Sequence, residues 1–101
     1  MAAAAPAPRT NSKVEAEFRA RTKKSAALYE RACKVIPAGL THDSRTLLPY
    51  AIYAARGLGP RKWDVDGNEY VDYFGGHGAL LLGHGYPAVI EAIQKQAPIG
   101  T

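Results

Sequence analysis

An Asp-Gly pair inside a short run of alternating apolar and polar residues is the feature of this sequence that most constrains its fold. Within residues 62–73, the aromatic residues Trp63 and Tyr70 lie on either side of Asp66-Gly67. An Asp-Gly pair readily supplies the positive φ angles that a tight hairpin turn requires. The sequence therefore predicts two antiparallel strands joined at Asp66 and Gly67.

A glycine-rich segment follows the predicted hairpin. Residues 75–85 contain five glycines, two histidines and the apolar run 79–82. Glycine lets the backbone approach a ligand or a neighbouring segment closely. The spacing matches neither common phosphate-binding pattern, because Gly-Lys-Ser/Thr is absent and the third glycine of a dinucleotide motif is missing. We therefore expect a loop at this position that does not bind phosphate.

Helical patterns lie on both sides of this central region. Asn11 or Ser12 can cap a helix that runs to about Lys34 with a break near Lys24, and Pro37 and Gly39 then end it. Apolar residues at helical spacing mark one face of each expected helix: Leu28, Ala32 and Val35 or Ile36 in the first, and Val89, Ile90, Ile93 and Ala97 in a second that begins at Tyr86 and Pro87.

Turn-forming and low-complexity residues define the remaining segments. Residues 1–11 are rich in Ala and Pro and are expected to be disordered. Residues 40–50 read as an extended loop, residues 52–56 as a short strand, and residues 57–60 as a turn. Together these elements predict an α+β fold with an N-terminal helix, a small antiparallel sheet and a following helix.

The order of six short motifs resembles the N-terminal region of class III pyridoxal-phosphate-dependent aminotransferases, a group that includes the glutamate-1-semialdehyde aminomutases. The resemblance covers residues 25–101, roughly three quarters of the chain. In family order, the motifs are Ile36-Pro37-Ala38-Gly39, Arg45, Gly57, the tryptophan-aspartate hairpin, Leu82-Gly83-His84, and the helix that begins near Pro87.

This resemblance implies that the chain is a truncated part of a longer fold-type I α/β enzyme. Residues 12–101 would form the N-terminal part of its small domain, and the lysine that forms the Schiff base with pyridoxal 5'-phosphate would lie in a large domain outside these 101 residues. The implied reaction transfers an amino group between an amino acid and a keto acid or aldehyde in a homodimer. No catalytic and no cofactor-binding residue is expected within this segment.

Arg45 is the sharpest candidate for a substrate contact. Its rigid guanidinium suits bidentate capture of a carboxylate, and the resemblance implies that role. The alternative interpretation is a surface arginine paired with Asp43. His77 in the glycine-rich segment and His42 near Arg45 are the other predicted substrate-binding residues, whereas His84 is expected to pack the loop.

Two departures from the aminomutase pattern favour a plain transaminase. The aminomutases generally have a tryptophan at the position of His77 and a serine near His42. The aminomutase stays open as an alternative within the family. An alternative of another class is a non-catalytic remnant or interaction piece, since the apolar helix faces lack partners within so short a chain.

Composition argues against several other functions. The net charge of +4 comes from the first 34 residues, which carry +5 against −1 for the rest, and no nucleic-acid-binding module accompanies it. Neither a metal site nor a membrane span is expected, because the histidine and carboxylate spacings fit no zinc or calcium motif and no apolar stretch is long enough. The lone Cys33 forms no internal disulfide and suits a cytoplasmic protein.

Overall fold

The computed structural model describes residues 11–100. The chain divides between Ala51 and Ile52 into two compact units, which are taken in turn below. Apart from Asn11, the segment predicted to be disordered lies outside the described residues.

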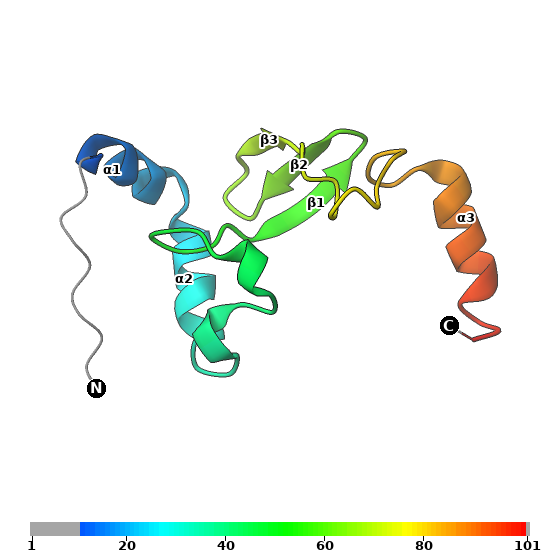
Figure 1. The fold of residues 1–101 in the computed structure, drawn as a ribbon, viewed down its shortest axis with the longest axis horizontal. Coiled ribbons are helices and arrows are strands. Elements are labelled where there is room, and N and C mark those ends of the chain that lie inside the picture. The colour runs from blue at the N-terminus through cyan, green and yellow to red at the C-terminus, as the bar shows by residue number, and fades with distance from the viewer. Residues whose placement is uncertain (1–10, 101) are drawn as a thin grey trace. The chain divides into compact units, whose positions relative to one another are not determined.

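The first unit is helical (Figure 1). Helices α1, Ser12–Arg21, and α2, Lys23–Ala32, are followed by two 3₁₀ turns, η1, Pro37–Gly39, and η2, Asp43–Arg45. The predicted N-terminal helix with an internal break is confirmed, with the break at Thr22 rather than near Lys24. Helix α2 ends two residues before the predicted end, because the amides of Val35 and Ile36 both bond back to the carbonyl of Ala32 and tighten the chain into a turn.

Thr22 and Tyr50 form the centre of the first unit. Thr22 is 2% exposed and Tyr50 6% exposed. The Thr22 hydroxyl lies 2.6 Å from the carbonyl oxygen of Phe18 and 2.9 Å from the Tyr50 hydroxyl. The rings of Phe18 and Tyr50 pack with centroids 5.1 Å apart. The break between the helices is thus stabilised by a buried hydrogen bond to the loop that leads out of the unit.

The second unit contains the sheet (Figure 1). Strands β1, Ala54–Leu58, β2, Arg61–Asp64, and β3, Glu69–Val71, pair antiparallel in the order β1-β2-β3. The predicted strand at residues 52–56 forms two residues later. Leu58 pairs with Arg61, so the turn narrows to Gly59-Pro60, and Gly59 supplies its positive φ of 53°.

The turn between β2 and β3 is wider than the predicted two-residue turn. Gly67 has a φ of 90°, but Asp66 is not among the described residues with positive φ, so a turn with positive φ at both central residues is excluded. The Asp64 carboxylate widens the connection, because it accepts hydrogen bonds from the amides of Asp66 and Asn68 at 3.0 and 2.8 Å.

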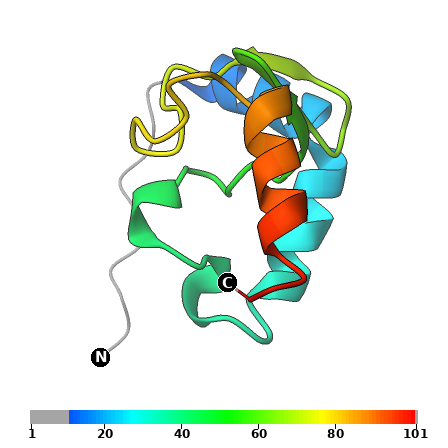
Figure 2. The same cartoon turned by 90° about the vertical axis from the view of Figure 1, so that its right-hand side faces the viewer.

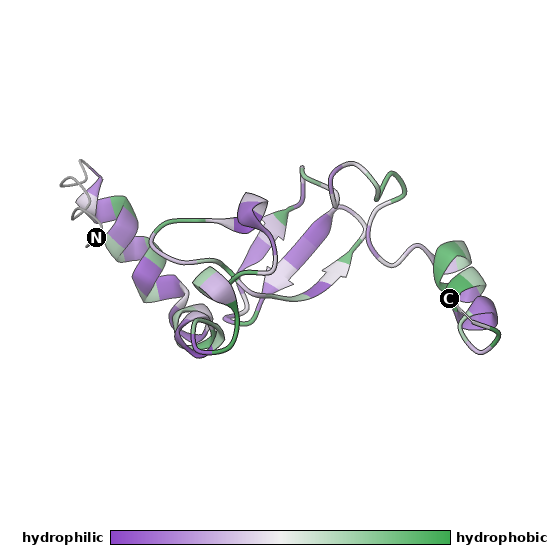
Figure 3. Ribbon diagram, turned by 60° about the horizontal axis from the view of Figure 1, so that its bottom comes forward, coloured by the Kyte–Doolittle hydropathy of each residue, from purple (hydrophilic) through white to green (hydrophobic). Residues whose placement is uncertain are grey.

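Helix α3, Pro87–Gln96, completes the second unit (Figure 2). Its start at Pro87 confirms the prediction. Apolar residues dominate its first turns and polar residues its last (Figure 3). Val89, Ile90 and Ile93 are 46%, 42% and 57% exposed. The α+β fold class is confirmed, and within residues 11–100 no helix is long and apolar enough to cross a membrane.

Candidate functional site

Arg45 ends the short turn η2 and is exposed to solvent. Its guanidinium donates one hydrogen bond, from Nη1 to the Thr41 hydroxyl at 3.0 Å. The alternative pairing with Asp43 is not formed, since that carboxylate instead accepts from the Ser44 amide at 2.8 Å. Most of the donors of the Arg45 guanidinium therefore face solvent, where a carboxylate could bind them in a bidentate manner.

His42 helps to build the turn that carries Arg45. The Ser44 amide donates to His42 Nδ1 at 3.1 Å, and the Ser44 hydroxyl lies 2.8 Å from the same nitrogen. The Arg45 amide in turn donates to the carbonyl of His42 at 3.1 Å. Because Nδ1 is engaged within the turn, the structure gives His42 a role in shaping the turn, and direct contact with a substrate stays a prediction.

His77 lies in the second unit, at an exposed position with an unusual backbone conformation. Its φ is 60°, and among the described residues only Ala38 shares a positive φ without being glycine. Its ring packs edge-on against Phe74, with centroids 4.3 Å apart. A non-glycine residue in the left-handed region costs free energy and persists only where its surroundings impose it. The segment that carries His77 is thus held in a defined shape.

The side chain of Asp72 makes several hydrogen bonds to and beside this segment. Its Oδ2 lies 2.6 Å from His84 Nε2, and its Oδ1 accepts from Lys62 Nζ at 3.2 Å. Oδ1 also accepts from the backbone amides of Phe74 and Gly75, at 3.1 and 3.2 Å. The side chain of Asp72 is only 5% exposed. The carboxylate therefore joins β2 to both ends of the glycine-rich segment.

These contacts set the charge state of Asp72. The hydrogen bond from His84 lowers the pKa of the Asp72 carboxyl, burial raises it, and the bonds from Gly75, Lys62 and Phe74 lower it further. The net result is a pKa far below the ordinary value of 3.8. Asp72 is thus a permanent anion at physiological pH.

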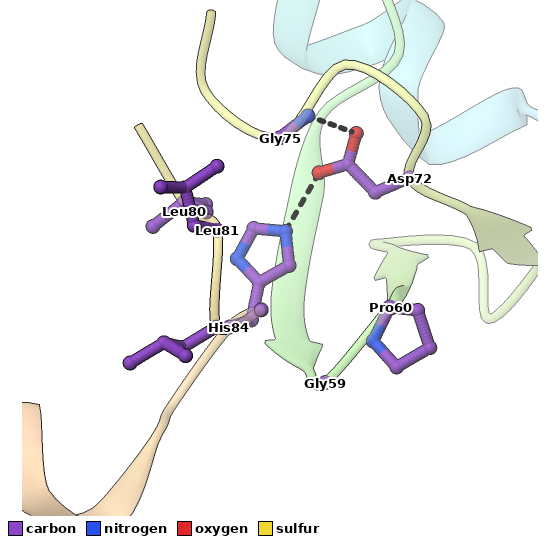
Figure 4. A pocket seen from close by; sticks show the side chains of 9 residues that line it. Gly59, Pro60, Asp72, Gly75, Leu80, Leu81 and His84 are labelled. Atoms are coloured by element: carbon purple, nitrogen blue, oxygen red, sulfur yellow. Dashed lines mark hydrogen bonds and ion pairs between the residues drawn. The ribbon is translucent and has the colours of Figure 1, made fainter. Parts of the chain in front are cut away.

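A pocket of about 320 Å³ lies beside the Asp72–His84 pair. Figure 4 shows the His84 ring pointing toward one oxygen of Asp72, while the amide of Gly75 approaches the other oxygen. The pocket combines this charged pair with an apolar wall, and its lining residues are Gly59, Pro60, Asp72, Gly75, Leu80, Leu81, Leu82, Gly83 and His84.

The three predicted substrate residues thus fall into two groups. His42 and Arg45 come together in one turn of the first unit, whereas His77 belongs to the second unit. The expected packing role of His84 fits its contact with Asp72. The sequence did not single out Asp72, because nothing in it pairs this residue with a histidine twelve positions later. No group of three metal-ligating side chains forms within residues 11–100.

Comparison with known proteins gives one consistent family. Residues 42–100 match the family model for class-III aminotransferases. The glutamate-1-semialdehyde 2,1-aminomutase of Symbiobacterium thermophilum is 43% identical over 86 residues, which cover 81% of this chain and 20% of that protein.

Solved structures agree with this match. An omega-transaminase from Sphaerobacter thermophilus superposes with a TM-score of 0.71 at 41% identity, covering 75% of this chain and 17% of the other. A structure described as a transaminase with PLP bound gives a TM-score of 0.75, also at 41% identity, over 79% of this chain and 19% of the other. The chain spans about a fifth of the length of the curated relatives that it matches.

Proposed function

Because the chain belongs to the class-III aminotransferase family, we propose that it provides the substrate-facing N-terminal segment of a pyridoxal-phosphate-dependent transaminase. The proposed enzyme moves an amino group between an amino acid and a keto acid or aldehyde, as a homodimer in the cytoplasm. The cofactor supplies the electron sink for this chemistry, and the protein supplies binding and orientation.

The lysines of this chain do not fit the cofactor. A lysine that bonds covalently to pyridoxal phosphate must be activated, and burial among neutral or cationic groups is the usual means. The least exposed candidate, Lys62, has a side chain that is 36% exposed and forms an ion pair with the Asp72 carboxylate at 3.2 Å. The other described lysines are exposed. We therefore assign cofactor binding to other parts of the proposed enzyme.

The observation that carries the proposal is the environment of Arg45. Its guanidinium is exposed, forms one hydrogen bond and has no carboxylate partner among the described residues. It also lies inside the segment that matches the family model. An arginine that serves only the fold would be expected to be paired with a carboxylate of its own unit. The guanidinium of Arg45, in contrast, is available to bind the carboxylate of an amino acid donor.

A chimera tests this role. The chain replaces the corresponding N-terminal segment of the omega-transaminase from Sphaerobacter thermophilus, to which it is 41% identical. In this chimera, Arg45→Ala should lower kcat/KM for amino acid donors by about 2 to 4 kcal/mol of transition-state binding, or roughly 30- to 900-fold. Arg45→Lys should recover only part of the loss, because a point charge cannot reproduce the planar fork.

Two controls make the result specific. Donors that lack a carboxylate should react at an unchanged rate with Arg45→Ala, and the cofactor's absorbance should stay normal. Arg61→Ala, which removes another exposed arginine, should leave both donor classes unaffected. Equal losses for donors with and without a carboxylate would show that Arg45 serves the fold and would remove the substrate-site assignment.

The aminomutase is the second candidate, because curated relatives of this chain include glutamate-1-semialdehyde 2,1-aminomutases. An aminomutase relocates the amino group within one molecule, whereas a transaminase requires a separate keto acid or aldehyde acceptor. Conversion of glutamate-1-semialdehyde by the chimera into an isomer of the same composition would therefore identify the aminomutase, whereas a transaminase that uses the substrate's own aldehyde as acceptor would give one product with two amino groups and one with none. A chimera that folds and binds the cofactor but catalyses neither reaction would point to a non-catalytic segment.

A further inference from the structure

Residues 72–84 form a loop whose two ends are both hydrogen-bonded to the Gly59-Pro60 turn. At one end, the amide of Asp72 donates to the carbonyl of Pro60 at 2.8 Å. At the other end, His84 and Gly59 exchange two backbone hydrogen bonds of 2.8 Å each. Both ends therefore rest on the turn between β1 and β2, as in a compact Ω-loop.

The side chains of the two terminal residues then close the loop. Asp72 Oδ2 and His84 Nε2 lie 2.6 Å apart, within the short range of charge-assisted hydrogen bonds. Lys62 of β2 reaches Oδ1 of the same carboxylate, so the titratable groups that face Asp72 are Lys62 and His84. The carboxylate is almost fully buried, which makes its loss of a partner costly.

The interior of the loop is held mainly by short-range backbone contacts. It contains four short-range backbone hydrogen bonds, made by the amides of Gly78, Ala79, Leu80 and Gly83. Beyond these bonds, the loop exposes its apolar residues, and Leu81 is 91% exposed. A segment with so little burial of its own has little local stability. The left-handed conformation of His77 thus lies in a segment that buries little apolar surface of its own.

We propose that Asp72 and His84 are positioning residues, which together hold the 72–84 loop in the conformation that presents His77 to the substrate. The link to substrate rests on the proposed function and on the predicted substrate contact of His77, whereas the effect on the loop rests on neither. Neither residue is assigned contact with the reacting atoms. Their role is to hold the chain segment that carries His77.

Hydrogen exchange in the chimera tests the effect on the loop without turnover. In His84→Ala, the amides of Leu80 and Gly83 should exchange about tenfold faster or more, while strand amides such as that of Trp63 keep their protection. His84→Gln retains a donor and should restore part of the protection. The control is Glu69→Gln, which removes the ion pair between Arg61 and Glu69 of the same sheet and should leave the loop amides unchanged.

Kinetics of the same variants test the link to the substrate. With the loop loosened, His84→Ala should raise KM for the amino acid donor by a several-fold larger factor than it lowers kcat. Adding His77→Ala to His84→Ala should raise KM little further, because both substitutions act through the contact of His77 with the substrate. Independent, additive effects of the two substitutions would overturn the positioning role. An inactive wild-type chimera with normal exchange behaviour would instead count against the proposed function.

Three exchange results would also overturn the proposal. Loop amides that exchange at the wild-type rate in His84→Ala would show that the pair does not order the loop. Equal loss of protection in loop and strands would show that the pair supports the whole unit. If His84→Ala fails to fold, His84→Gln decides, and failure of that variant as well would assign the pair to folding rather than to positioning.

Discussion

At the scale of single residues, Gly67 shows how one backbone angle fixes a turn. Its φ is 90°, and a Cβ added to it would meet nothing within 4 Å. A side chain at position 67 would therefore cost free energy through the backbone conformation and not through crowding by neighbouring atoms. Gly67→Val should therefore destabilise the chimera by about 1 kcal/mol or more, whereas Gly67→Asn, which tolerates the left-handed region, should cost less. Thermal melting measures the difference, and equal melting temperatures for both variants would contradict it.

The lowered pKa values of two aspartates, Asp64 and Asp72, predict how the stability of the fold depends on pH. Burial raises the pKa of Asp64, but hydrogen bonds from Asn68, Tyr70 and Asp66 lower it more, so its pKa lies below 3.8 in the folded state. The pKa of Asp72 is lowered as well, chiefly by His84. A depressed folded pKa adds stability that is complete above the unfolded value and is lost as the pH falls toward the folded value.

The free energy of unfolding should accordingly fall below about pH 4, where unfolded aspartates begin to take up protons. Urea titrations of the chimera between pH 6 and 3 measure this loss. Asp72→Asn should be less stable at neutral pH and should show a shallower decline with acid. A decline as steep as that of the unsubstituted chimera would mean that Asp72 contributes nothing to the acid sensitivity.

At the scale of elements, strand β1 and the 72–84 loop meet at Gly57. A Cβ on Gly57 would come within 2.6 Å of the His84 ring, although the backbone of Gly57 lies outside the left-handed region. Gly57→Ala should thus destabilise the chimera by about 1 to 3 kcal/mol through overpacking. In a His84→Ala background most of this cost should disappear, because the ring atoms at 2.6 and 2.8 Å are gone and only the Cβ of residue 84, at 3.0 Å, remains close.

A double-mutant cycle by urea unfolding measures this coupling. Gly83→Ala is the matched comparison, because a Cβ there would meet the backbone of Gly59 at 2.7 Å and His84→Ala would not relieve it. If the cost of Gly57→Ala is the same with and without the His84 ring, the close approach of β1 to that ring is not what requires a glycine at position 57.

Local patterns predicted the elements well and their connections less well. The helix at Pro87 and the strands around Asp66-Gly67 follow from capping, periodicity and turn chemistry, all of which act between near neighbours. The β2–β3 turn was predicted too narrow, since the Asp64 carboxylate takes over two backbone amides. The pairing of Asp72 with His84 depends on how the chain folds back on the β1–β2 turn, and no short-range pattern records that.

The candidate site shows the same division. Arg45 could be singled out from its type, its loop context and the family resemblance, but its lack of a carboxylate partner among the described residues became visible only in the structure. Tyr50 fell within a predicted loop and proved to be one of the most buried residues of the first unit. Its contact with Thr22 spans 28 positions, so it follows from tertiary packing rather than from a local preference.

At the scale of the whole molecule, each unit has few buried side chains. Tyr50 and Ala51 are the only buried hydrophobic residues among those described, while the apolar side chains of α3 are exposed. A chain with so small a core gains little stability from burial alone. So small a core fits the proposal that the segment functions within a larger enzyme.

The 101-residue chain alone should not bind pyridoxal phosphate at a specific lysine. Lys62 is ion-paired with Asp72 and the other described lysines are exposed, so none lies in the buried surroundings that activate a lysine as a nucleophile. Borohydride reduction in the presence of the cofactor, followed by peptide mapping, should give weak labelling spread over Lys13, Lys23, Lys24, Lys34, Lys62 and Lys95. The chimera, treated identically, should be labelled stoichiometrically at one lysine outside this chain. Stoichiometric labelling of one lysine in the 101-residue chain would instead place the cofactor site within these residues, and the assignment of cofactor binding to the rest of the enzyme would be wrong.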